Sequence, residues 1–71
     1  MGAMVLVFKT SIQTRQDCRR LAPFLDDQQT RWTVDLDDCD KVLRVVTPNP
    51  CVNRIIALVQ AQGFFCAELD D

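Results

Sequence analysis

Apolar and polar positions alternate along the chain in a way that predicts four β-strands. Met4–Lys9 is a nearly continuous apolar run, which is typical of a central strand covered at least partly on both faces. In Thr30–Asp37 every second residue is apolar, which indicates a strand with one buried side. Two further short apolar segments complete the set. The expected strands are Met4–Lys9, Thr30–Asp37, Lys41–Val46 and Phe64–Leu69.

The first expected helix begins after the first strand. Thr14 is a suitable N-cap, and Asp17 stands three residues later, as in a capping box. Pro23 removes a backbone donor and should kink or shorten the helix. Apolar residues follow at the spacing of one helix face, and they are Cys18, Leu21, Ala22 and Leu25.

The second expected helix begins near Asn49, which is a good N-cap, with Pro50 suited to the first helical position. Gly63 is expected to end this helix. Its apolar face repeats at the same spacing, through Val52, Ile55, Ile56 and Val59.

The resulting order, β-α-β-β-α-β, predicts an α+β fold of the ferredoxin-like class. Right-handed crossovers place the strands in the antiparallel order 4-1-3-2, with both helices on one face. Residues 4–71 are expected to form this single domain, whereas residues 1–3 resemble a cloning remnant. The first loop, the hairpin turn and the Gly63–Phe64 turn should lie at one end of the sheet. The residues expected on the uncovered sheet face include Arg31, Thr33, Asp35, Arg44 and Val46.

Composition narrows the function classes. The chain has 71 residues and a net charge of −2, which argues against nonspecific nucleic-acid binding. No apolar run approaches the roughly 20 residues that span a bilayer. The first residues show no basic segment or cleavage pattern of a signal peptide, so we expect a cytoplasmic protein with reduced thiols.

The sequence offers little material for catalysis. It contains no histidine, and it shows neither a glycine-rich phosphate loop nor a nucleophile with a base within sequence reach. We therefore expect no enzyme. The four cysteines form no C-x-x-C pair; they are Cys18, Cys39, Cys51 and Cys66.

The order of elements, the length and the first loop, FKTSIQTRQDC, resemble the heavy-metal-associated domains. The resemblance covers Met4 to about Leu69. In that family the loop carries M-x-C-x-x-C, whose two thiolates bind Cu(I), Zn(II) or a similar ion. Here Ile12 stands at the methionine position, while Thr14 and Asp17 replace the two cysteines. The resemblance therefore implies a degenerate member without metal or other cofactor.

Such a domain is expected to act as a small binding module, through its open sheet face or a strand edge, with a protein partner or a second copy. The alternative is a soft-metal carrier for Cu(I) or Zn(II) that uses the displaced Cys18 with Cys39 or Cys66.

Three further hypotheses concern the loops. Cys18 beside several arginines could be a reactive thiol, although a buried apolar role is the simpler interpretation. The arginines at the first helix could bind an anion or a partner, but Asp17 opposes an anion and the acidic hairpin turn could pair with them instead. The segment DLDDCD lacks the glycine and glutamate of a calcium loop. The arginines in question are Arg15, Arg19 and Arg20.

Overall fold

The chain forms one four-stranded antiparallel sheet and two helices, as seen in a computed structural model that describes residues 2–26, 30–48 and 51–69. The strand order is β2-β3-β1-β4, which reads 4-1-3-2 from the β4 edge. The expected α+β arrangement is therefore confirmed, with β1 in a central position. In chain order the elements are β1 (Met4–Thr10), α1 (Arg15–Leu25), β2 (Arg31–Val34), β3 (Leu43–Thr47), α2 (Val52–Ala61) and β4 (Cys66–Glu68).

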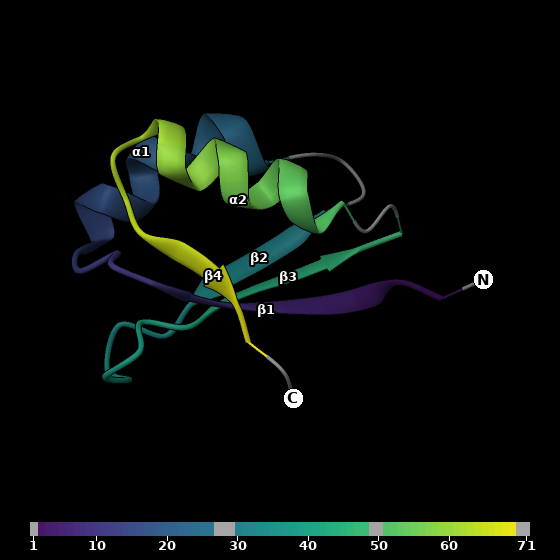
Figure 1. Cartoon of the computed structure of the whole chain (residues 1–71), viewed down its shortest axis with the longest axis horizontal. Helices are drawn as coiled ribbons and strands as arrows, with labels where there is room; N and C mark the ends of the chain where they lie inside the picture. Colours follow the sequence, from purple (N-terminus) through teal and green to yellow (C-terminus); the bar gives the residue numbers. More distant parts are fainter. Residues whose placement is uncertain (1, 27–29, 49–50, 70–71) are drawn as a thin grey trace.

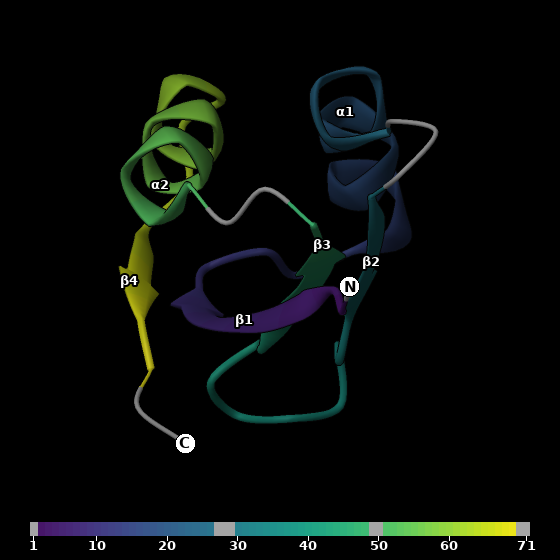
Figure 2. The same cartoon turned by 90° about the vertical axis from the view of Figure 1, so that its right-hand side faces the viewer.

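Both described helices cover the same face of the sheet, and neither of them lies on the opposite face (Figures 1 and 2). Figure 2 shows α1 above the β2 side and α2 above the β4 side. The core fills the space between the two layers, because the inward residues of the strands meet the apolar stripes of the helices. Its fully buried large side chains are Phe8, Ile12, Leu21, Leu43, Val45 and Val59.

The start of α1 agrees with the sequence. Thr14 is the N-cap, and its hydroxyl accepts a hydrogen bond from the Asp17 N–H at 3.0 Å. The Asp17 carboxylate accepts in return from the N–H groups of Gln13 and Thr14, at 3.1 and 3.3 Å. Pro23 lies inside the helix, which ends two residues later at Leu25. The capping box thus satisfies helix-start donors that would otherwise lack a partner.

The start of α2 differs from the sequence prediction. The helix begins at Val52 with Cys51 as its N-cap, and no side chain caps it. The prediction of Asn49 as the N-cap is therefore wrong, and Asn49 and Pro50 lie outside the described residues. At the other end Gly63 has a φ of 91°, which agrees with its expected role as the stop.

The strands are shorter than the alternating pattern predicts. β2 ends at Val34 because Asp35 begins a turn, in which its carboxylate accepts from the Asp37 N–H at 3.1 Å. The Asp38 carboxylate likewise accepts from the Asp40 N–H at 2.8 Å. These local side-chain bonds compete with strand pairing, which the apolar pattern alone does not reveal.

Three loops meet at one end of the sheet, as expected. The Thr10 N–H donates to the Asp40 carbonyl at 3.1 Å, which links the end of β1 to the hairpin turn. The Ser11 N–H donates to the Phe65 carbonyl at 3.2 Å, and the Phe65 N–H donates to the Ser11 hydroxyl at 2.8 Å.

Neither of the described helices has the length and apolar character needed to cross a membrane.

Candidate functional site

The loop before α1 uses its characteristic residues for the fold. Ile12 is fully buried in the core, and its N–H donates to the Thr10 hydroxyl at 3.2 Å. Thr14 and Asp17 bond to each other's backbone in the capping box. The three positions that would carry a metal motif therefore hold a core residue and a helix cap.

The cysteines lie in unlike environments. Cys66 belongs to the core, and burial raises the pKa of its thiol to about 11. Cys18 packs against the core from α1, and burial, followed by the Asp17 carboxylate, raises the pKa of its thiol. A raised pKa lowers the thiolate fraction that both nucleophilic attack and metal binding require. Cys39 and Cys51 are exposed, and the described structure places all four as free cysteines.

The arginines of α1 do not pair with the acidic turn, so that expectation is wrong. The turn's one ion pair among the described residues joins the Asp40 carboxylate to the Lys9 ammonium at 3.5 Å. Arg20 instead lies over the Phe64 ring, 5.6 Å from its centroid, and donates to the Gln62 carbonyl at 3.4 Å. Arg15 and Arg19 are exposed on the helix surface. Arg20 thus joins α1 to the end of α2, which is a structural use.

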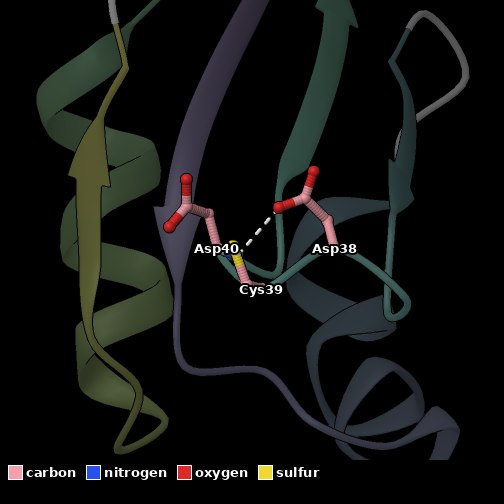
Figure 3. A group of neighbouring side chains, drawn as sticks. All are labelled: Asp38, Cys39 and Asp40. Carbon is pink, nitrogen blue, oxygen red and sulfur yellow. Dashed lines mark hydrogen bonds between the residues drawn. The ribbon is translucent and has the colours of Figure 1, made fainter.

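The hairpin turn brings three possible metal ligands together. One donor atom from each of Asp38, Cys39 and Asp40 lies within 4.8 Å of the others (Figure 3). However, the Asp38 carboxylate already accepts from the Asp40 backbone, and Asp40 pairs with Lys9. Cys18 and Cys66, which the soft-metal alternative pairs with Cys39, are not part of this group. The cluster is explained by turn geometry and an internal ion pair.

The uncovered side of the sheet, which we call the open face, shows the most distinctive surface. Strand register places Arg31 opposite Val46, and Val46 opposite Val5, in one row across β2, β3 and β1. The next row holds Thr33, Arg44 and Val7 in the same way. Because paired residues share a side of the sheet, all six face away from the helices.

The open face combines exposed apolar groups with positive charge. Val5 is 55% exposed, and a shallow depression beside it is lined by residues of β2 and β3. Val7, on the same face, is buried although it lies outside the core cluster. The residues that line the depression are Arg31, Trp32, Thr33, Arg44 and Val46.

No carboxylate of the described residues lies within ion-pair distance of Arg31 or Arg44. At the other end of the face, charge is matched internally, since Lys9 pairs with Asp40 and the Asp35 carboxylate accepts from the turn. Of the described cations on the open face, Arg31 and Arg44 are therefore the ones that form no ion pair.

The sequence correctly placed Arg31, Thr33, Arg44 and Val46 on this face, but it missed Val5 and Val7. The apolar run of β1 hides the alternation that would have revealed them, because both sides of this strand carry large aliphatic residues. Comparisons with protein-family models, with curated proteins and with solved structures find no match to this chain. The resemblance to heavy-metal-associated domains therefore stays a prediction.

Proposed function

We propose that this domain is a small non-catalytic interaction module that binds a protein partner through its open face. Its relation to the heavy-metal-associated domains, as a degenerate member, is part of this proposal. The observation that carries it is the apolar depression flanked by Arg31 and Arg44, on the sheet face opposite the two described helices. An apolar surface rimmed by polar groups is typical of interaction sites.

The chemistry of the other surfaces supports this choice. The chain has no histidine to act as a base, and the raised pKa values of the Cys18 and Cys66 thiols make these two groups poor nucleophiles near neutral pH. The loop end of the sheet uses its polar groups in internal hydrogen bonds. On the open face, Arg31 and Arg44 form no ion pair among the described residues, so their guanidinium donors are available to a partner.

The strand edges are weaker candidates than the open face. A partner strand would have to pair with β2, which has four residues, or with β4, which has three. Such short edges offer few ladder hydrogen bonds, and short edge strands are a common protection against edge pairing. The face is therefore the better binding surface of this sheet.

A charged residue within the apolar part of the face tests the proposal. We expect Val5→Asp with Val46→Asp to abolish capture of partners that the unchanged domain recovers from a native extract. The matched control places the same charges on the helix side, as Ala57→Asp with Ala61→Asp, at exposed positions of α2. Quantitative mass spectrometry of the recovered proteins, with thermal melts of each variant, is the measurement. Equal recovery by both double variants would refute the role of the open face.

The soft-metal alternative makes a different prediction. A carrier that uses Cys18 with Cys39 or Cys66 would bind one Cu(I) or Zn(II) per chain, with sub-micromolar affinity, and lose it on Cys18→Ser. We expect instead that the reduced protein binds Cu(I) no more strongly than a single exposed thiol does. Competition against a Cu(I) chelator of known affinity separates the two functions.

A further inference from the structure

We propose that the partner presents an extended acidic segment, with a carboxylate held between Arg31 and Arg44 and an aliphatic or aromatic side chain in the depression over Val46. This inference rests on the proposed function and names the chemistry of its partner.

The register brings the two arginines together. Arg31 lies opposite Val46, and Arg44 lies opposite Thr33, so the arginines occupy diagonal positions on neighbouring strands. Diagonal pairs on one face are about 7–8 Å apart, within reach of long side chains. Two guanidinium groups at this spacing can donate to the same carboxylate, for which their planar shape is well suited.

The charge of the molecule makes an acidic partner the fitting one. The chain carries a net charge of −2, so this end of the open face is a local positive site on an acidic protein. In the free domain the two arginines repel each other, and a bound carboxylate would remove this repulsion. The residues of the depression that lie between them are mostly apolar in their exposed surface. A lone anion would leave that surface in water, whereas a segment with an apolar side chain would cover it.

A nucleic acid fits less well. Single-stranded binding surfaces usually stack bases on aromatic side chains. Phe8 lies in the core, and Trp32, although it also lines the depression, packs against the core and donates its indole N–H to the Asp26 carboxylate, so neither of these rings is offered to a stacking base. Two arginines and no stacking platform leave only weak phosphate contacts.

A second copy of this chain also fits less well. Four strands at about 4.8 Å spacing and about five residues each give a flat area of roughly 300 Å². A stable interface usually buries about 800 Å² on each partner. The open face is thus too small for a stable dimer, but it is large enough for a short segment bound transiently.

The test titrates the intact domain with four synthetic pentapeptides and follows its backbone amides by NMR. The probes are Glu-Ser-Leu-Ser-Glu, Gln-Ser-Leu-Ser-Gln, Glu-Ser-Ser-Ser-Glu and Lys-Ser-Leu-Ser-Lys, in which the first, third and fifth side chains of an extended chain lie on one side. We expect the first to shift the amides of Arg31, Thr33, Arg44 and Val46, and to bind more tightly than the other three. Raising the salt concentration from about 20 to about 200 mM should weaken this binding several-fold.

Variants then test the two arginines directly. Arg31→Glu with Arg44→Glu should weaken binding of the acidic-aliphatic peptide by about tenfold or more, and the milder Arg31→Gln with Arg44→Gln by a smaller factor. The control reverses two exposed charges on the helices, as Arg19→Glu with Arg54→Glu, and should change the affinity by less than about twofold. Amide spectra of each variant verify that the fold persists.

The outcomes separate this inference from the proposed function. If the neutral or basic peptide binds the same amides as tightly, or if no peptide shifts them, the acidic partner is refuted. Preferential binding of a single-stranded oligouridylate, or shifts that depend on protein concentration alone, would refute it in favour of nucleic acid or a second copy. The proposed function falls on a different result, namely equal partner capture by the Val5→Asp and Val46→Asp double variant and its helix-side control.

Discussion

On β3, Leu43 and Val45 face the helices and are 0% and 1% exposed, whereas Arg44 and Val46 on the same strand face away from them. On the covered side, apolar side chains fill the space under the helices. The backbone N–H groups of the adjoining loops donate hydrogen bonds to carbonyl groups of the same chain. On the open face, two arginines have no carboxylate among the described residues, and a large part of Val5 remains in water.

The two sides of β3 differ in what they contribute to folding. The inward residues contribute burial, which is the main favourable term in folding. The outward residues contribute little to that term, so they can carry charges and apolar groups suited to a partner. We therefore expect the binding function of this small domain on the open face, whose side chains contribute least to the stability of the fold.

The largest loss of stability should come from truncating a buried side chain on the covered side. Leu43→Ala removes a fully buried side chain from the middle of the sheet and should lower the free energy of unfolding by about 2–5 kcal/mol. The matched change on the open face, Val5→Ala, should cost less than about 0.5 kcal/mol, because this side chain is already 55% exposed. Urea denaturation of both variants measures the difference. Similar losses for the two would mean that the open face is also covered in solution.

The next effect depends on pH and again separates buried from exposed positions. Burial raises the pKa of Cys66 from 9.0 to about 11, so the folded state keeps its proton when the unfolded state has lost it. The contribution of this thiol to the free energy of unfolding should therefore be fully present below pH 9. It should fall by about 1–3 kcal/mol as the pH rises toward 11. The chain has no tyrosine, which removes one source of competing titration in this range.

Cys66→Ala should flatten this fall, leaving a smaller one from Cys18, whose pKa is also raised. Cys39→Ala, at an exposed position, serves as the control and should keep the slope of the unchanged protein. Urea denaturation repeated at several pH values measures the slopes. An unchanged slope in Cys66→Ala would contradict the assignment to this thiol.

Several parts of the covered side could be predicted from sequence because the signals are local. The capping box at Thr14 and Asp17 depends on two residues three positions apart, and the glycine stop at Gly63 depends on one backbone angle. Leu43 and Val45 follow from simple alternation. Each of these features is decided within a few residues, so no knowledge of distant contacts is required.

The remaining features depend on contacts between distant segments. Lys9 and Asp40 are 31 positions apart, and nothing in their local sequence indicates that they pair in preference to the arginines of α1. Cys51 replaces Asn49 as the N-cap of α2, which shows that a favourable capping residue does not fix the helix start. The proposed carboxylate site at Arg31 and Arg44 likewise depends on the register that brings their two strands together.

A smaller effect is expected at the helix start that the loop provides. Thr14→Ala removes the hydroxyl that accepts from the Asp17 N–H, and it should lower the free energy of unfolding by about 1 kcal/mol. Thr14→Ser keeps the hydroxyl and should lose much less. Urea denaturation of the two variants gives the comparison. Equal losses would show that the methyl group, and not the cap, is responsible.

The smallest effect concerns the arginines themselves. Because Arg31 and Arg44 repel each other and have no ion pair among the described residues, Arg44→Gln should leave stability unchanged or raise it by a few tenths of a kcal/mol. Lys9→Gln breaks the pair with Asp40 and should instead lower it by up to about 1 kcal/mol. Thermal melts at low and high salt measure both, and salt should reduce both differences. A clear loss of stability in Arg44→Gln would show that Arg44 stabilises the folded domain. The proposal that its guanidinium group is available to a partner would then be contradicted.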